Sequence, residues 1–357
     1  MTHEIIDTEL KEIESNILRL KNQAAESIIQ LGYELNRAKE KVPHGEWGEW
    51  LKNRVNFSQR TANLYMKIAK EFGSNSQSIS NLEVTKLGLL LDVPEEKRGL
   101  YQKYYFKPIY FDIIVPKLRW ITVDYPSVSS AQQFGMSTEA YEEYFFDAMT
   151  VDYKELFENM LPLKEVLDNG RHVQILSNDT NLEFDIMNYK SAICSGKINL
   201  PDGEVFIAPD LNSANGYINF NVPTRYQGSS FEELYLKFEN GKVIDYNSKT
   251  NLLKLKKILE NDAGNKYIGE FAIGTNPCIN TPKSNILFDE KILGSFHIAL
   301  GNSHDLSDNG NRASIHWDMV KMMTDEYNGG KIIIDDELIQ ENGIFIPDKL
   351  KVLNKRK

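Results

Sequence analysis

The sequence predicts an α+β protein, with an N-terminal all-α helical module followed by a mixed α/β domain with largely antiparallel sheets. In the first hundred residues, apolar side chains recur at helical spacing with charges between them. After about residue 117, short β-rich runs are separated by Gly, Asn, Asp and Pro turns, and the helices are too irregularly placed for a doubly wound sheet. We therefore expect two domains, over residues 1–105 and 106–357.

Composition narrows the class of protein. With 357 residues and 41% hydrophobic content the chain can bury large cores, and its net charge of −10 argues against a protein that coats nucleic acid with its whole surface. Two cysteines, Cys194 and Cys278, are too few for a disulfide framework or a Cys-rich metal site. The N-terminus has no signal-peptide pattern, and the longest apolar stretches are far shorter than the roughly 18–20 residues that cross a bilayer. We expect a cytoplasmic protein with no membrane contact.

The N-terminal module is predicted to consist of amphipathic helices. A long helix or helix pair is expected over residues 9–40, and a shorter helical face ends near Asn56 and Phe57. Ser58 then stands where an N-cap would begin a further helix that runs through Lys70. Helix, tight turn and helix form the expected outline.

A basic segment in this module contrasts with the acidic balance of the whole chain. Between Leu51 and Lys70 there is no acidic residue, and the five basic ones are Lys52, Arg54, Arg60, Lys67 and Lys70. One interpretation is a helix-turn-helix whose second helix contacts DNA through Gln59, Arg60 and Asn63. The other is a helical hairpin with a solvated basic face, because such outlines arise often by chance.

A change in composition separates the two predicted domains. Residues 73–78 are rich in Ser and Asn, and a charged stretch bounded by Pro94 and Gly99 follows. Six aromatic residues from Tyr101 to Phe111 make that stretch too apolar for a free linker, so we expect it to pack on a neighbouring domain. The boundary is placed near residue 105.

The second domain is predicted to contain short strands around three longer helices. The helices are expected at residues 138–147, 153–169 and 251–260. The expected strands lie at residues 173–176, 182–187, 205–208, 216–222, 234–238 and 243–245. After Gly329 and Gly330, closely spaced turn residues predict a terminal strand meander.

Histidines and carboxylates that stand alone in apolar strand-like runs are the candidates for a functional site. Each one alone is weak evidence, because a strand glutamate usually faces solvent and a histidine on an apolar face usually belongs to the core. Together they favour a mixed His/carboxylate metal centre for zinc, cobalt or manganese. The candidates are Glu204, Glu270, Glu290, His297, His316 and Asp318.

The triplet His316-Trp317-Asp318 is the most specific of these signals. Side chains two apart on a strand project to the same face, so His316 and Asp318 are predicted to share one site while Trp317 packs on the other side.

Several motifs in fixed order then carry a family resemblance from about residue 110 to 346. They are Tyr125-Pro126-Ser127, Gly135-Met136-Ser137, Gly203-Glu204-Val205-Phe206, the run from Gly269 to Pro277, His297-Ile298-Ala299-Leu300-Gly301 and His316-Trp317-Asp318. With these motifs the chain resembles the thermophilic-type, aminopeptidase T-like metalloaminopeptidases. The resemblance implies a homodimeric enzyme that uses two divalent metal ions to remove N-terminal residues from peptide substrates.

The resemblance also implies roles for individual residues. The six candidates named above would be the metal ligands, with Glu270 bridging the two ions and accepting a proton from water. His304 stands where the family carries a tyrosine that stabilises the tetrahedral intermediate, so it is a second catalytic candidate. A histidine there changes its charge near neutral pH, which predicts an altered pH profile.

The first part of the chain resembles a different group, a helical domain of unknown function found in phage and mobile-element proteins. The likeness covers about residues 9–100 and rests on Leu31 to Leu35, His44 to Trp47 and Ser58 to Ala62. It stands where the family has an α/β domain, so the chain has the appearance of a fusion. The alternative function is a DNA-associated mobile-element protein with an inactive or regulatory peptidase-like domain.

Overall fold

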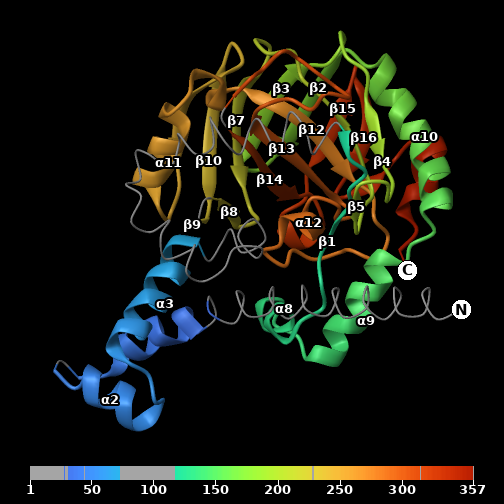
Figure 1. The fold of residues 1–357 in the computed structure, drawn as a ribbon. Helices are drawn as coiled ribbons and strands as arrows, with labels where there is room; N and C mark the ends of the chain where they lie inside the picture. Colours follow the sequence, from blue (N-terminus) through green and yellow to red (C-terminus); the bar gives the residue numbers. More distant parts are fainter. Residues whose placement is uncertain are drawn as a thin grey trace, which may run out of the picture. The chain divides into compact units, whose positions relative to one another are not determined.

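The computed structural model describes residues 31–72 and 117–356 together with Ile28, apart from residues 44, 227, 228 and 314. The chain divides into two compact units, one of residues 1–119 and 227–229 and one of residues 120–226 and 230–357 (Figure 1). The predicted long helix over residues 9–40 and the predicted linker lie mostly outside the described residues.

The described residues of the first unit between 31 and 72 form helices joined by short turns. Residues 31–41 are helical, and α2 (Trp47–Arg54) and α3 (Gln59–Phe72) follow. The hydroxyl of Ser58 accepts the Thr61 N–H at 3.0 Å, which is the N-cap that the sequence predicted. Leu35, Trp47, Leu51, Ala62 and Met66 form a small apolar core between the helices.

The second unit contains two large sheets whose described strand pairs are all antiparallel, as the sequence predicted (Figure 1). The eight-stranded sheet has the order β11 (Lys242–Asn247), β10 (Leu234–Glu239), β7 (Asn215–Phe220), β3 (Thr180–Asp185), β2 (His172–Ser177), β15 (Lys331–Ile334), β16 (Glu337–Glu341) and β17 (Ile344–Phe345). The five-stranded sheet has the order β14 (His316–Met322), β13 (Ser295–Gly301), β12 (Ile268–Gly274), β6 (Glu204–Ile207) and β4 (Ala192–Cys194).

Short strand pairs and helices complete this unit. The strand pairs are β1 (Thr122–Val123) with β5 (Asn199–Leu200) and β8 (Thr224–Tyr226) with β9 (Ser229–Phe231). The α-helices are α8 (Val128–Gln133), α9 (Thr138–Met149), α10 (Tyr153–Asn169), α11 (Leu252–Glu260) and α12 (Ile286–Asp289). The 3-10 helices are η3 (Ala263–Lys266), η4 (Asp325–Tyr327) and η5 (Asp348–Asn354). The predicted helices and strands of this region therefore agree with the structure to within a few residues.

One hydrophobic core joins the two large sheets with α10 and α11. Alternate residues of the five-stranded sheet enter it, among them Val205, Phe271, Phe296 and Trp317. Burying each such side chain contributes about 1.5–3 kcal/mol. This core fixes which face of the five-stranded sheet carries its remaining side chains. None of the described helices is both long enough and apolar enough to cross a membrane.

Candidate metal centre

The second face of the five-stranded sheet collects the polar candidates. The strand register places Glu204 opposite Gly274, His297 opposite Ala272, and Asp318 opposite Ala299. Side chains alternate along a strand, so every second residue points to the same face of the sheet. The residues just named, and those two positions away on the same strand, lie on the face turned away from the large core. Small residues at the middle of this face leave room for the longer polar side chains around them. Six polar side chains, which we call the His/carboxylate cluster, gather here: Glu204, Glu270, Glu290, His297, His316 and Asp318.

Ligand atoms in the cluster form two overlapping groups. In one group, ligand atoms of Glu270, His316 and Asp318 all lie within 4.8 Å of one another. In the other group, ligand atoms of Glu290, His297 and Asp318 meet the same limit, so Asp318 belongs to both. The structure thus brings together all six residues that the sequence analysis named as ligands.

Glu270 stands between the two histidines. Its Oε1 lies 3.3 Å from His297 Nε2, and its Oε2 lies 3.9 Å from His316 Nε2. His297 Nε2 is also 3.8 Å from Glu204 Oε2, and His316 Nε2 is 3.3 Å from Asp318 Oδ1. Each imidazole therefore turns Nε2 toward carboxylates.

A hydrogen bond to the backbone fixes the orientation of the His316 ring. Its Nδ1 lies 2.7 Å from the backbone carbonyl of Asn302, so Nδ1–H donates there and Nε2 is left for a cation. Trp317 points into the large core, where its Nε1 donates to Thr224 Oγ1 at 3.1 Å and its ring stacks on Tyr226. As the strand spacing predicted, Trp317 enters the core while His316 and Asp318 share the opposite face.

The electrostatics of the cluster favour a cation. Burial raises the pKa of Glu204 to about 8, and burial also raises the pKa of Glu290. Despite the burial of its ring, hydrogen bonding to Glu270 and the charges of Glu204 and Asp318 raise the pKa of His297 to about 9. Despite the desolvation of its ring, Asp318 and Glu270 raise the pKa of His316 to about 10.

Two buried carboxylate oxygens test whether the donor set fits a metal. Among the described residues, Glu204 Oε2 and Asp318 Oδ1 are buried without a hydrogen-bond partner. A buried oxygen without a donor is costly, and a divalent cation bound between such oxygens would remove that cost. Carboxylate oxygens and neutral imidazole nitrogens are also the donor types that zinc, cobalt and manganese accept. The residues present therefore fit a divalent metal site.

Two charged residues of this site were not predicted from the sequence. Lys291 is fully buried, and its Nζ lies 2.5 Å from Glu204 Oε1 and 2.8 Å from Glu290 Oε1. Asp202, which is 2% exposed, lies 3.5 Å from the same ammonium. A charged run between the apolar Phe288 and Ile292 was the available signal for Lys291, but such runs usually form solvated turns.

His304 makes its described contacts outside the cluster. Its ring packs edge-on against Phe206, with centroids 5.2 Å apart, and its Nδ1 accepts the Leu306 N–H at 3.1 Å. Phe206 shares the ligand-bearing face of β6 with Glu204. Within the described chain, no hydrogen bond or ion pair joins His304 to the cluster, so its catalytic role stays a prediction.

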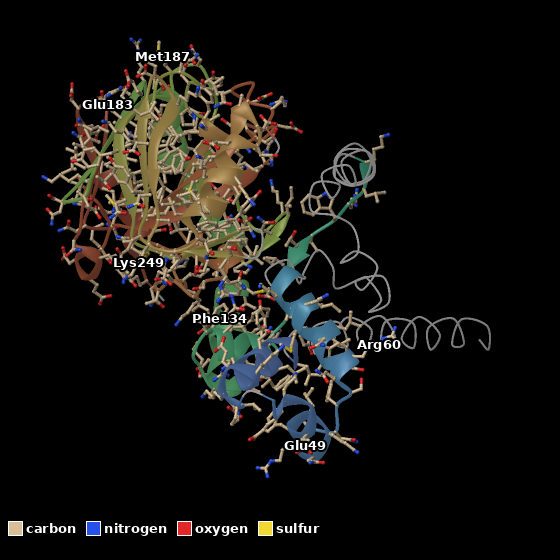
Figure 2. All side chains as sticks on the ribbon, turned by 90° about the vertical axis from the view of Figure 1, so that its left-hand side faces the viewer. Glu49, Arg60, Phe134, Glu183, Met187 and Lys249 are labelled. Carbon is tan, nitrogen blue, oxygen red and sulfur yellow. The ribbon has the colours of Figure 1, made fainter. Side chains whose placement is uncertain are left out.

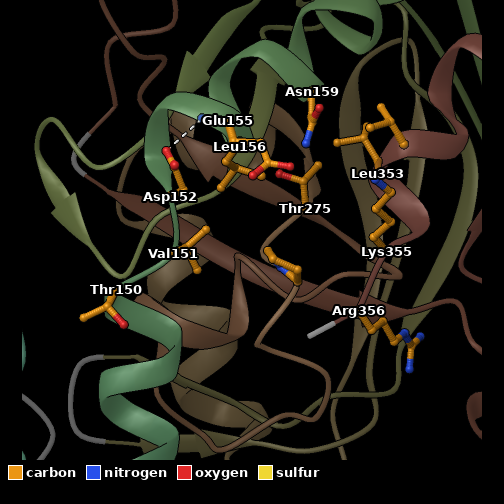
Figure 3. A pocket seen from close by; sticks show the side chains of 12 residues that line it. Thr150, Val151, Asp152, Glu155, Leu156, Asn159, Thr275, Leu353, Lys355 and Arg356 are labelled. Atoms are coloured by element: carbon orange, nitrogen blue, oxygen red, sulfur yellow. Dashed lines mark hydrogen bonds between the residues drawn. The ribbon is translucent and has the colours of Figure 1, made fainter.

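A separate cavity of about 430 Å³ lies beside the start of α10 and the end of η5 (Figure 3). Its lining includes Glu155, Asn159, Thr275, Lys355 and Arg356. No member of the His/carboxylate cluster lines it, so we do not assign the candidate chemistry to this cavity.

Comparison with known proteins places the chain beside a family of metalloproteases. The sequence signature described as thermophilic metalloprotease (M29) matches residues 52–345. The chain is 31% identical to aminopeptidase AmpS of Bacillus subtilis over 130 residues, which are 34% of this chain and 30% of that protein. It is 32% identical to aminopeptidase T of Thermus aquaticus over 119 residues, which are 32% of this chain and 28% of that protein. The matched region thus spans about a third of the length of these curated relatives.

The fold has a counterpart among solved structures. Wild-type AmpT from Thermus thermophilus matches with a TM-score of 0.59 and 20% identity, covering 71% of this chain and 72% of that one. The family match also begins earlier than the expected residue 110, and it includes residues 52–105 of the segment that the sequence analysis assigned to a separate helical module. Because the match extends over well more than half of its residues, the chain belongs to the thermophilic metalloprotease (M29) family.

Proposed function

We propose that this protein is a metal-dependent aminopeptidase that hydrolyses N-terminal residues from peptides. In this proposal the His/carboxylate cluster holds two divalent ions, which are zinc, cobalt or manganese. The observation that carries it is the arrangement of ligand atoms in two groups that share Asp318, with the two oxygens of Glu270 directed at different histidines.

The charges of the centre support two ions rather than one. Five carboxylates lie at the site, four from the cluster (Glu204, Glu270, Glu290 and Asp318) and one from Asp202. Lys291 supplies one positive charge, so with neutral histidines the net charge is −5 + 1 = −4. Two divalent ions balance this charge, whereas one would leave two uncompensated negative charges in a buried site.

The chemistry follows from the positions of the protein groups. When bound, the ions would supply Lewis-acid activation of a water molecule and of the scissile carbonyl. Glu270 accepts the proton of that water at a carboxylate oxygen and passes it to the leaving amine. A carboxylate of the cluster binds the ammonium of the substrate's free N-terminus, which selects chain ends. His304 donates a hydrogen bond from Nε2 to the developing oxyanion, because its Nδ1 is already occupied by Leu306 N–H.

Metal analysis combined with a substrate panel tests this function. Purified protein would be freed of metal, reloaded with zinc, cobalt or manganese, and assayed on aminoacyl chromogenic substrates and on the same substrates with an acetylated N-terminus. We expect metal-dependent release from the free-amine substrates only. Equal turnover of the acetylated substrates, or full activity in chelator, would contradict the proposal.

We further propose that the basic segment of the first unit contacts DNA. All five basic side chains of this segment are exposed, and Arg60 is labelled in Figure 2. Such a face would bind duplex DNA more weakly at about 200 mM than at about 50 mM salt, because counterions are released on binding. The full chain would be titrated beside an Arg60→Ala, Lys67→Ala variant and a Lys237→Ala, Lys242→Ala control, which removes exposed charges of the second unit. Equal binding by all three proteins would exclude this contact.

A further inference from the structure

Lys291 is a buried lysine whose ammonium contacts three carboxylates. Its side chain is 0% exposed, and Nζ lies 2.5 Å from Glu204 Oε1, 2.8 Å from Glu290 Oε1 and 3.5 Å from Asp202 Oδ1. An ammonium donates hydrogen bonds and accepts none, and the shortest of these contacts is a hydrogen bond to Glu204. Because these contacts hold Glu204 and Glu290, we treat Lys291 as a positioning residue.

The oxygens that Lys291 does not hold are turned toward the histidines. Glu204 gives Oε1 to Lys291, while its Oε2 lies 3.8 Å from His297 Nε2. Glu290 gives Oε1 to Lys291 and also offers a ligand atom within 4.8 Å of His297 and Asp318. The Lys291 ammonium thus contacts two of the proposed metal ligands, Glu204 and Glu290, on the side away from the histidines.

The backbone, in turn, holds the ammonium through Asp202. The two oxygens of Asp202 accept the N–H groups of Gly196 at 2.7 Å and Gly203 at 3.0 Å. Buried Asn276 then ties the two parts together, since its backbone N–H donates to Lys291 O at 3.0 Å and its side chain donates to Asp202 O at 2.7 Å. The position of Lys291 is therefore set by fixed backbone groups rather than by mobile side chains.

The Lys291 ammonium lies beside a third group of possible ligand atoms. Cys194, Asp202 and Glu204 place ligand atoms within 4.8 Å of one another, and the Lys291 ammonium contacts both carboxylates of that group. In the two groups around His297 and His316, the described ion pairs of Glu270 and Asp318 are with histidines, and none is with a lysine or arginine.

We propose that Lys291, anchored by Asp202, is the built-in cation of the centre and orients Glu204 and Glu290 for metal binding. The inference rests on the proposed function, since it requires that the cluster binds metal. Removal of a group that orients metal ligands typically weakens metal affinity by about 10- to 100-fold. Without Lys291, Glu204 and Glu290 lose the partner that fixes their rotamers and repel each other in a buried site.

The test is a manganese titration of metal-free proteins by calorimetry. The wild type would be compared with Lys291→Met, Asp202→Asn and a matched control, Lys321→Met. Lys321 is also a buried lysine of this sheet, but it bonds to Asp179 Oδ1 at 2.9 Å and to Asn219 O at 2.7 Å, outside the cluster. The control therefore reports what the loss of a buried lysine does to folding alone, and circular dichroism would follow the fold of each protein.

We expect roughly 10- to 100-fold weaker manganese binding in Lys291→Met and about 10-fold weaker binding in Asp202→Asn. If Lys291→Met does not fold, the Asp202→Asn measurement decides the question. Lys321→Met should bind as the wild type does, even where its melting temperature falls. Wild-type affinity in a folded Lys291→Met, or in Asp202→Asn when Lys291→Met does not fold, would overturn this inference alone. Absence of binding by the wild type in this titration and in the same titration with zinc and with cobalt would overturn the proposed function and this inference with it.

Discussion

Replacing Glu270 by Gln removes one charge from the centre and almost no volume. Glu270 is 6% exposed, and its two oxygens lie 3.3 Å from His297 Nε2 and 3.9 Å from His316 Nε2. In glutamine one of these oxygens becomes an NH2 group, which cannot hold a cation or accept a proton. The variant therefore loses one contact point between the two ligand groups and the proposed general base together.

The expected loss of kcat is at least ~100-fold. A factor of 100 corresponds to about 2.7 kcal/mol of transition-state stabilisation, since each tenfold change is worth 1.36 kcal/mol. Because the side-chain volume is conserved, the melting temperature of the metal-free protein should not fall by a comparable free energy. A loss of activity with the fold retained would place the effect in the chemistry.

The assay is turnover of an aminoacyl chromogenic substrate at saturating metal, and the matched control is Glu183→Gln. Glu183, which is labelled in Figure 2, also pairs with a strand histidine, His172, at 3.8 Å, but it lies on β3 of the eight-stranded sheet and not on the sheet that carries the cluster. The control should keep full activity. Turnover by Glu270→Gln within a few fold of the parent would refute the role we assign to Glu270.

Two further predictions concern the remaining groups of the site. If His304 stabilises the oxyanion, His304→Tyr should keep or raise kcat and flatten its pH dependence near ~6.5, while His304→Ala should lower kcat; identical rates and pH profiles in all three proteins would make His304 a filler of its loop. The raised pKa values of His297, about 9, and His316, about 10, mean that both rings carry protons at pH 7 in the metal-free protein. Metal binding should then release protons, and metal affinity should increase as pH rises. The stability of the metal-free protein should fall from about pH 6.5 through about pH 9 as His297 loses its proton. Calorimetry in two buffers of different ionisation enthalpy measures the proton release, and a value of zero would contradict these protonation states.

The strand residues of the site were predictable because local spacing determines which face they occupy. His316 and Asp318 are two apart, so any extended conformation places them together and sends Trp317 to the core. Glu270 and His297 each interrupt an apolar run and Glu204 directly precedes one, so these polar residues are visible in the sequence. What brings these strands side by side is the pairing of β6, β12, β13 and β14, which only the fold reveals.

Other parts of the site depend on contacts between segments far apart in the sequence. Asp202 lies in a Pro-Asp-Gly turn and Lys291 in a charged run, and both patterns are typical of exposed loops. Their burial follows from the approach of the β12 end, through Asn276, to both segments. The expected boundary near residue 105 rested on composition alone, whereas the compact units divide between Arg119 and Trp120.

The central claim is that the His/carboxylate cluster holds two divalent ions. Crystals grown with manganese or cobalt, measured at the absorption edge of that metal, would locate bound ions directly by anomalous scattering. We predict two peaks about 3.5–4 Å apart, with Glu270 between them and Asp318 within reach of both. A single peak in the cluster would contradict the two-ion centre, and peaks elsewhere with none in the cluster would contradict the metal site itself.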